Sequence, residues 1–217
     1  MNDHLVDRRE AWSVVSRRVK ATGRVQNYVE DVVTRPDGGT MTRQWVTHTG
    51  AVAVIAMDDR GRIAVVHQYR HPVAYRLVEP SAGILDVDDE PAIEAARREL
   101  AEEAQLAADR WETLVDVFTS PGGMQESIRI FLARDLHPVP RPDGFAIADE
   151  EIDMGLYWVD LDEIVEKIYA GQIQSPTLID GVLALKLAMV SGRLDSLRPA
   201  DAPWDARRAK QDRDTEV

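Results

Sequence analysis

The sequence predicts an α+β fold, or an α/β fold with a mixed sheet. Short apolar runs are typical of buried strands, and one long amphipathic segment is typical of a helix. Strands and helices follow one another without strict alternation, which argues against a purely parallel sheet. With 217 residues, 44% of them hydrophobic, the chain suffices for one substantial domain and a small addition.

The N-terminal part predicts a β-hairpin. Residues 1–20 read as a polar lead-in, and residues 25–34 (VQNYVEDVVT) suit a strand. The PDGG run at 36–39 is a turn signal, and residues 40–47 read as the returning strand. We therefore assign residues 1–48 to a separate N-terminal β region.

The central part, residues 49–192, carries most of the predicted elements. Apolar runs and turn signals indicate strands at 51–57, 63–69, 114–118, 128–133 and 155–159. Helical patterns cover 90–106, 161–169 and 176–190, and a Pro-rich loop covers 137–144. Residues 193–217 are charged and interrupted by proline, and we expect this tail to be partly disordered.

Composition excludes several function classes. The chain has no cysteine, which rules out disulfides, thiolate nucleophiles and Cys-ligated zinc, and its five histidines show no zinc-binding spacing. A net charge of -12 should repel nucleic acid. No apolar run reaches the roughly 18 residues of a membrane span, and the charged N-terminus lacks a signal core. We therefore expect a cytoplasmic protein that binds neither nucleic acid nor membrane.

The helix predicted at 90–106 carries an acidic patch. Its apolar stripe is formed by Ile93, Ala96, Leu100, Ala104 and Ala107. Glu99, Glu102 and Glu103 flank this stripe at spacings that bring their carboxylates together. Like charges repel, so a hard divalent cation is a natural partner, and Arg98 should brace the patch through Glu94 and Glu102. A solvated helix face with ordinary Glu–Arg pairs is the competing interpretation.

These residues resemble the Nudix box. The match consists of Gly83, Glu90 and the run from Arg98 to Glu103 (RELAEE), with seven residues between Glu90 and Arg98 as in the family. Two departures stand out. Six residues rather than five separate Gly83 from Glu90, which places Asp89 at the usual distance, and Gln105 replaces the glycine that usually ends the helix. A longer loop would keep Glu90 in the role of the family's glutamate.

The resemblance extends to the bacterial ADP-ribose pyrophosphatase subgroup. The segments that carry it are 42–46 (TRQWV), 50–54 (GAVAV), 67–70 (HQYR), 79–86 (EPSAGILD) and 120–123 (SPGG). The subgroup implies the Nudix fold, a mixed sheet sandwiched between helices. It also implies a homodimer with an exchanged N-terminal β region, and cleavage of ADP-ribose to AMP and ribose 5-phosphate.

The resemblance also implies the roles of individual residues. Mg²⁺, or alternatively Mn²⁺, would be held by Glu99, Glu102, Glu103 and the Ala82 carbonyl. Glu151 would act on the attacking water, with Glu150 as the second candidate; an acidic surface loop is the competing interpretation. We assign structural roles to Gly83, Glu90 and Arg98.

Substrate contacts are expected from five further residues. Arg70 is placed by motif to hold a phosphate, and Glu126 resembles a residue that contacts substrate or metals. Arg43, Gln44 and Trp45 would meet the adenine, bound either to their own chain or to the partner chain. Ordinary structural roles compete in each case: a strand-end arginine, a strand-edge charge, or a core or interface tryptophan.

Two other functions remain open at the level of the sequence. A Nudix hydrolase of another nucleoside diphosphate derivative, such as GDP-mannose, would share the box and differ in the base pocket. A Nudix-like ligand sensor without catalysis would require a degenerate box and an attached DNA-binding domain. The box is intact here and the tail is short, so we expect an enzyme acting on a small nucleotide sugar.

Overall fold

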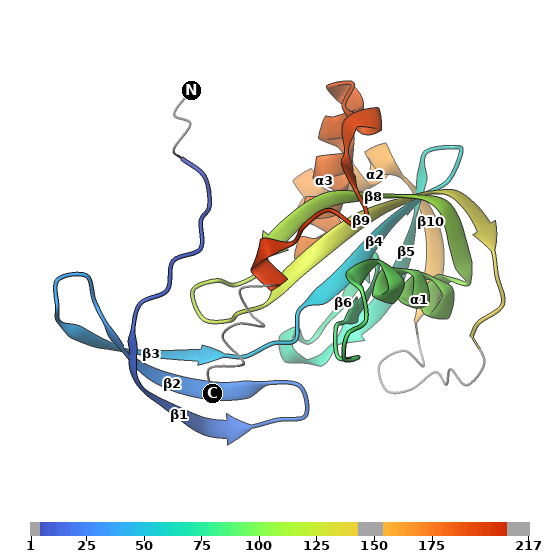
Figure 1. The fold of residues 1–217 in the computed structure, drawn as a ribbon. Coiled ribbons are helices and arrows are strands. Elements are labelled where there is room, and N and C mark those ends of the chain that lie inside the picture. The colour runs from blue at the N-terminus through green and yellow to red at the C-terminus, as the bar shows by residue number, and fades with distance from the viewer. Residues whose placement is uncertain (1–4, 143–153, 208–217) are drawn as a thin grey trace. The chain divides into compact units, whose positions relative to one another are not determined.

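A computed structural model describes residues 5–142 and 154–207 (Figure 1). The chain divides into two compact units. The N-terminal unit comprises Met1–Thr49, Ser120–Glu126 and Trp204–Val217, and the central unit comprises Gly50–Thr119 and Ser127–Pro203. Within the described residues, no helix is both long and apolar enough to cross a membrane.

The N-terminal unit contains a three-stranded antiparallel sheet. Its strands β1 (Val14–Thr22), β2 (Asn27–Thr34) and β3 (Thr40–Val46) lie in the order β1-β2-β3. The hairpin formed by β2 and β3 was predicted, and the turn between them includes Gly38 at φ 83°. Strand β1 was not predicted. Nearly all of its side chains are exposed, so it lacks the alternation that identifies a half-buried strand.

The central unit is built on an eight-stranded mixed sheet. The strand order is β10-β5-β4-β9-β8-β11, with β6 pairing with β5 and β7 pairing with β4. Strands β4 and β9 are parallel and the other pairs are antiparallel. The strands are β4 (Ala51–Met57), β5 (Arg62–Arg70), β6 (Tyr75–Glu79), β7 (Ser81–Ile84), β8 (Leu106–Phe118), β9 (Ser127–Pro138), β10 (Gly155–Asp160) and β11 (Arg198–Pro199).

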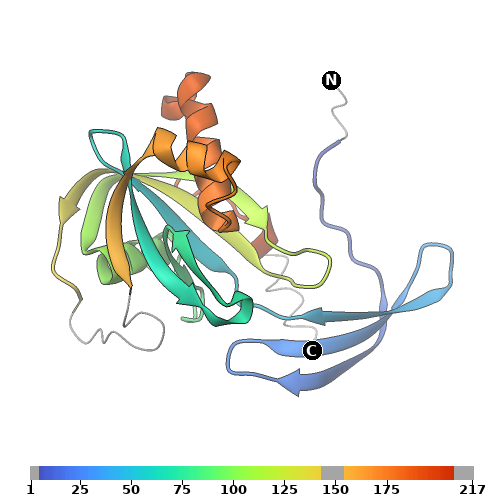
Figure 2. The ribbon, with the colours of Figure 1, turned by 180° about the vertical axis from the view of Figure 1, so that it is seen from behind.

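Helices cover both faces of this sheet. Helices α2 (Leu161–Tyr169) and α3 (Pro176–Val190) lie on one face, and α1 (Ala92–Ala104) lies on the other (Figure 1). Figure 2 shows the same arrangement from behind. The described residues also include two short 3-10 turns, His71–Val73 and Leu194–Ser196. The predicted sandwich of a mixed sheet between helices is therefore confirmed.

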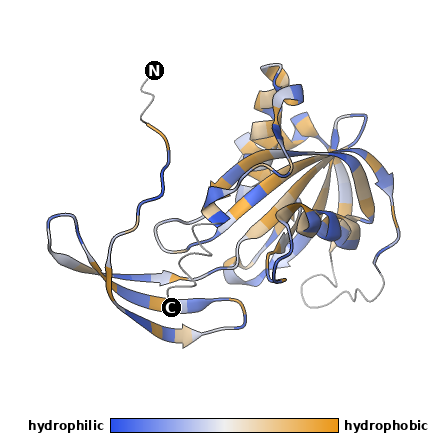
Figure 3. Cartoon of the chain, in the orientation of Figure 1, coloured by the Kyte–Doolittle hydropathy of each residue, from blue (hydrophilic) through white to orange (hydrophobic). Residues whose placement is uncertain are grey.

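Side-chain alternation along β4 explains why the sheet has two buried faces. Ala51, Ala53 and Ile55 join the apolar core beneath α2 and α3, whereas Val52 and Val54 point to the opposite face and are also fully buried. Helix α3 approaches the sheet closely, since a Cβ on Gly181 would lie 2.6 Å from Cγ1 of Ile55. Such a doubly buried strand reads as a continuous apolar run in the sequence, and β4 is coloured toward the hydrophobic end of the scale in Figure 3.

The predicted bounds are accurate for the apolar elements and poor for the polar ones. Strand β4 and helices α2 and α3 match their predictions, but β8 begins eight residues before the predicted 114–118. Strands β6 and β7 were not predicted, because they span only five and four residues. Ala107 lies in β8 rather than on the helical stripe, because α1 ends at Ala104.

Residues 193–203 of the predicted tail pack within the central unit. Strand β11 pairs with β8, and the Thr113 hydroxyl donates to the Pro199 carbonyl at 2.9 Å. The buried Arg129 side chain donates to the carbonyl of Ala202 at 2.6 Å and to that of Pro203 at 3.0 Å. Hydrogen bonds to backbone carbonyls thus hold this C-terminal segment in place, although its charged and proline-interrupted sequence did not predict burial.

Candidate active site

Helix α1 ends on a strained residue. Gln105 adopts a left-handed conformation (φ 54°, ψ 41°), and its N–H bonds the carbonyls of Leu100 and Ala101. Gln105 therefore fills the terminating position that glycine takes in the Nudix box. A side chain in this conformation costs about 1 kcal/mol relative to glycine. The helix nevertheless ends here in a left-handed cap, as a terminating glycine would end it.

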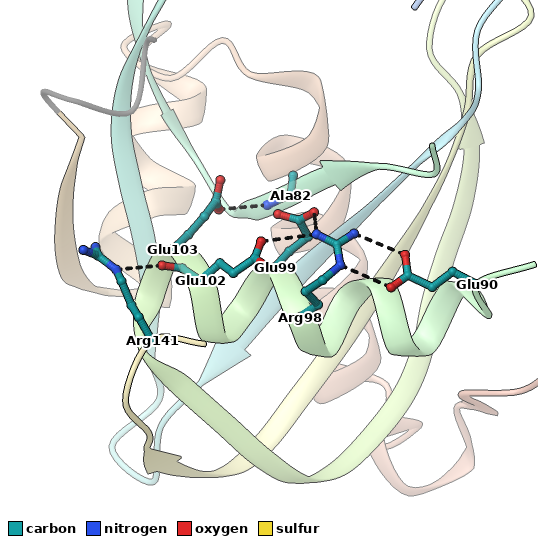
Figure 4. A network of polar contacts seen from close by, with 7 residues as sticks. All are labelled: Ala82, Glu90, Arg98, Glu99, Glu102, Glu103 and Arg141. Atoms are coloured by element: carbon teal, nitrogen blue, oxygen red, sulfur yellow. Dashed lines mark hydrogen bonds and ion pairs between the residues drawn. The ribbon is translucent and has the colours of Figure 1, made fainter. Parts of the chain in front are cut away.

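Arg98 is the centre of a charge network on α1 (Figure 4). Its Nε and Nη2 each donate to one oxygen of Glu90 at 3.2 Å, and its Nη1 donates to Glu99 at 2.7 Å and to Glu102 at 3.2 Å. The hydrogen bonding with Glu90, and then the charges of Glu99 and Glu90, outweigh burial and raise the pKa of Arg98 further above its ordinary value. Arg98 is therefore a permanent cation that holds three carboxylates.

The extra residue in the Gly83–Glu90 loop does not displace Glu90. Asp89 takes a left-handed conformation (φ 59°), which aspartate tolerates better than most residues, and Glu90 then reaches Arg98. The predicted brace through Glu94 is wrong, because Glu94 pairs with Arg97 at 2.7 Å. Glu90, in the loop before α1, therefore takes the role that was predicted for Glu94 of the helix.

Glu103 lies apart from Arg98 and points toward the sheet. It is 7% exposed, and its Oε2 accepts the backbone N–H of Ala82, in β7, at 3.1 Å. Gly83 makes the neighbouring contact possible, since a Cβ there would lie 2.0 Å from Oε1 of Glu99. The glycine thus allows β7 and the glutamate face of α1 to meet closely.

The α1 cluster, defined here as Glu90, Arg98, Glu99, Glu102 and Glu103, has more negative than positive charge. The first four side chains are only 13–31% exposed. Within residues 5–142 and 154–207, no three His, Asp or Glu side chains are arranged to hold a metal ion as they stand. Carboxylate oxygens are nevertheless the donors that Mg²⁺ and Mn²⁺ prefer, and the Gly83 contact brings a backbone segment beside them. The chemistry of the donor set fits a hard cation.

Arg141 belongs to this region and was missed by the sequence analysis. Its Nε donates to the Glu102 carbonyl at 2.9 Å, near the C-terminal end of α1. The same loop contributes the Val139 N–H, which donates to the Gln105 carbonyl at 3.0 Å. A usable signal existed, because Arg141 stands between two prolines that restrict the loop.

Arg70 is held by a carboxylate on the same sheet. Its Nε donates to Oε2 of Glu79 at 2.9 Å, and the side-chain amide of Gln68 donates to the same oxygen at 2.9 Å. Glu79 and Gln68 are buried, whereas the Arg70 side chain is 39% exposed. Arg70 is therefore an arginine at the end of β5 whose Nε is held by Glu79.

The expected adenine contacts lie in the N-terminal unit and do not share one face. Pairing across β2 and β3 places Arg43 and Trp45 on one side of the sheet and Gln44 on the other. The Trp45 indole donates to Asp31 at 3.0 Å, and Arg43 donates to the Thr42 carbonyl at 3.0 Å. A ligand that meets Trp45 through this face would not meet Gln44 through it.

Polar neighbours engage the remaining predicted residues of the N-terminal unit. Gln44 accepts from the Tyr28 hydroxyl and donates to Glu30, both at 2.8 Å. Glu126 lies 3.3 Å from Nε2 of His48, a residue that is 7% exposed. Glu150 and Glu151 lie outside the described residues, so the assignment of the base stays a prediction.

Comparisons with known proteins agree with the resemblance. A model of the NUDIX domain matches residues 47–179. An ADP-ribose pyrophosphatase of Mycobacterium tuberculosis is 42% identical over 193 residues, covering 89% of this chain and 91% of that protein. A methanol dehydrogenase activator of Bacillus methanolicus is 35% identical, covering 76% and 88%. The crystal structure of an ADP compounds hydrolase superposes with a TM-score of 0.70 at 16% identity, covering 87% of this chain and all of that one, which shows a common fold.

Proposed function

Since the chain belongs to the Nudix hydrolase family, we propose that it hydrolyses the diphosphate bond of ADP-ribose, or of a related ADP-sugar. The products would be AMP and ribose 5-phosphate. The similarity to the Mycobacterium tuberculosis ADP-ribose pyrophosphatase supports this substrate, because it covers 89% of the chain and so extends beyond the matched domain.

The excess of carboxylates in the α1 cluster is the observation that carries the proposal. Arg98 donates to three of the four glutamates, and Glu103 accepts the Ala82 N–H, so the cluster gathers carboxylate oxygens of the kind that bind a hard cation. Nudix hydrolases generally use divalent metal ions, and Mg²⁺ or Mn²⁺ would be held here by Glu99, Glu102, Glu103 and the Ala82 carbonyl. When bound, such an ion neutralises the diphosphate and lowers the pKa of a coordinated water.

The chain's own residues would position the reactants and move one proton. Arg98 keeps Glu99 and Glu102 oriented, and the Ala82 N–H keeps Glu103 oriented. Arg70 would bind a phosphate oxygen pair, since a guanidinium matches that geometry. Glu151, with Glu150 as the alternative, would accept the proton of the attacking water as it adds to phosphorus.

The proposal includes a homodimer in the cytoplasm. Strand β1 lies at the edge of its sheet and exposes Val14 (47%), Val15 (62%) and Val19 (49%). A second copy would cover such an apolar edge, and Arg43, Gln44 or Trp45 would then contact the base. Light scattering on the intact chain should give twice the monomer mass of 24.3 kDa. A monomer mass at micromolar concentration would remove the dimer from the proposal.

A substrate panel with product identification tests the reaction. ADP-ribose, other ADP-sugars and GDP-mannose are incubated with Mg²⁺ in ¹⁸O water, and the products are resolved by mass spectrometry. We expect ADP-ribose to give AMP and ribose 5-phosphate, with the label identifying the attacked phosphorus. Preferential cleavage of GDP-mannose would support the alternative hydrolase, and tight ADP-ribose binding without turnover would support a sensor.

A single variant tests the proposed base. Glu151→Gln should lower kcat by roughly a hundredfold or more with little change in KM, because the amide no longer accepts the proton. Glu150→Gln serves as the matched control and should retain most of the activity. The reverse pattern would assign the base to Glu150, and full activity in both variants would exclude this loop.

A further inference from the structure

Glu79 is a buried carboxylate that the proposed chemistry does not use. It is 9% exposed and is the last residue of β6, separated from β7 by Pro80 alone. Burial of a charge is costly unless it is paired, and here Arg70 and Gln68 both donate to Oε2. Two side chains of β5 therefore converge on one carboxylate oxygen of β6, which fixes the three side chains together.

Strand alternation places these three side chains on the face of the sheet that α1 covers. Ile63 and Val65 of β5 point into the core beneath α2 and α3, so Gln68 and Arg70 point to the opposite face. Glu79 pairs with Val66, which shares that opposite face. The arginine and the α1 cluster thus lie on one side of the central unit.

The same short segment serves the α1 cluster. Three residues after Glu79, the Ala82 N–H donates to Glu103. The stretch 79–82 therefore contacts Arg70 through a side chain and Glu103 through the backbone. A segment that touches both a guanidinium and a candidate metal ligand sets their separation, and a diphosphate with its cation needs such a separation to be constant.

Glu79 binds Arg70 through Nε, which leaves the two terminal nitrogens of the guanidinium for a ligand. The hydrogen bond uses Nε, which is the donor next to the aliphatic stem. Within the described residues, Arg70 makes no other hydrogen bond, so Nη1 and Nη2 stay available as a fork. That fork matches two oxygens of a phosphate, whereas an ammonium offers a single point charge.

We propose that Glu79, together with Gln68, is a positioning residue that orients Arg70 so that its Nη fork meets the substrate diphosphate. The inference rests on the proposed function, since it assigns Arg70 to the anionic part of that substrate. It differs from a purely structural role, in which Arg70 would only neutralise the buried Glu79.

A double-mutant cycle separates these two roles. Arg70→Ala, Glu79→Gln and the double variant are assayed for kcat/KM on ADP-ribose and, by calorimetry, for binding of ADP, which carries a diphosphate. We expect each single change to lower both quantities roughly tenfold, as loss of a charge-assisted hydrogen bond does. In the Arg70→Ala background, Glu79→Gln should add less than about a twofold loss, because its effect passes through Arg70.

Matched controls identify indirect effects. Arg62→Ala removes another arginine of β5, which pairs with Asp58 at 2.7 Å, and should change ADP binding less than about twofold. The Mg²⁺ concentration for half-maximal rate should not move in Glu79→Gln. If that variant folds poorly, Gln68→Ala provides a second test, with a smaller loss that again vanishes in the Arg70→Ala background.

Three outcomes would overturn the inference: unchanged ADP affinity in Glu79→Gln, additive losses in the double variant, or a raised Mg²⁺ requirement. Failure of the proposed function is distinguishable from these. If the wild-type chain binds ADP but cleaves no nucleotide sugar, the proposed reaction fails, while the ADP cycle still tests the role of Glu79.

Discussion

The two units each contain a partly buried arginine among carboxylates, but the charge balance differs. In the N-terminal unit, Arg17 of β1 pairs with Asp31 of β2 through two hydrogen bonds of 2.8 and 3.0 Å. Trp45 of β3 donates to the same carboxylate, and the Arg17 guanidinium lies 5.5 Å from its ring centroid. Arg17 and Asp31 thus form a two-bond ion pair, which the Trp45 indole extends.

The α1 cluster, as defined above, contains one arginine and four glutamates, and Arg98 donates to three of them. Repulsion among these partly buried carboxylates costs free energy, and the ion pairs of Arg98 with Glu90, Glu99 and Glu102 reduce that cost. A balanced pair such as Arg17–Asp31 stabilises the fold, because each charge is compensated by the other. A cluster with more glutamates than arginines can instead bind a further cation. The comparison therefore predicts that substitutions in the first affect stability and substitutions in the second affect catalysis.

The largest effect should come from Glu103→Gln. The amide oxygen can still accept the Ala82 N–H, so the fold should persist, but the charge needed for a cation is lost. We expect magnesium-dependent turnover to fall by at least roughly a hundredfold, with an unchanged urea midpoint. Glu94→Gln on the exposed side of α1 is the control and should stay within about twofold. Near-normal turnover in Glu103→Gln would contradict the metal assignment.

A stability effect of comparable size in free energy should come from Asp31→Asn. The change leaves Arg17, only 20% exposed, without its carboxylate. We expect the free energy of unfolding to fall by about 2 kcal/mol, below the range for fully buried pairs because Arg17 keeps some solvent. Urea unfolding measures it against Asp37→Asn, whose pair with Arg35 is exposed and should matter by less than about 0.5 kcal/mol. Equal losses in both variants would argue against the balanced-pair interpretation.

Arg98→Lys tests the unbalanced cluster from its cationic side. A single ammonium cannot bind both oxygens of Glu90 and also reach Glu99 and Glu102. We expect turnover to fall about tenfold and the Mg²⁺ requirement to rise, while Arg97→Lys changes neither. Because the pKa of Arg98 is raised, its charge persists at neutral and acid pH and is lost only in strong alkali. If the turnover of Arg98→Lys returned to the wild-type level on a change of pH near neutrality, this role of Arg98 would be contradicted.

The smallest effect is expected at the end of α1. Gln105→Gly should raise the free energy of unfolding by about 1 kcal/mol, since glycine adopts the left-handed conformation without a steric penalty. Chemical denaturation compares it with Gln105→Ala, which keeps the penalty and should give no gain. Stabilisation by alanine as well would mean that the side chain, rather than the backbone, is responsible.

Sequence patterns identified the α1 cluster because its members are close along the chain. Residues three and four apart share one face of a helix, so Glu99, Glu102 and Glu103 followed from spacing alone. The same rule failed for Glu94, because a loop residue, Glu90, is better placed to reach Arg98 from outside the helix. Helical spacing predicts contacts between residues of the helix and gives no information about the loop that precedes it.

Contacts between distant segments were outside the reach of these patterns. The Glu79–Arg70 and Glu102–Arg141 contacts join residues nine and 39 positions apart. In the N-terminal unit, the run Arg43-Gln44-Trp45 suggested one binding surface, yet a strand sends Gln44 to the opposite side. Adjacent residues share a site only if the backbone conformation turns them the same way.

The sequence alone determined the elements and the chemistry that they carry. Apolar runs located β4, α2 and α3, and the spacing of glutamates located the candidate cation site. Only the tertiary structure decided which carboxylate each arginine binds, and that Glu103 is buried against Ala82. It also decided that β1 adds a third strand to the N-terminal sheet. The physical reason is that periodicity records which side of an element is buried, whereas pairing between elements depends on distances that chain order does not encode.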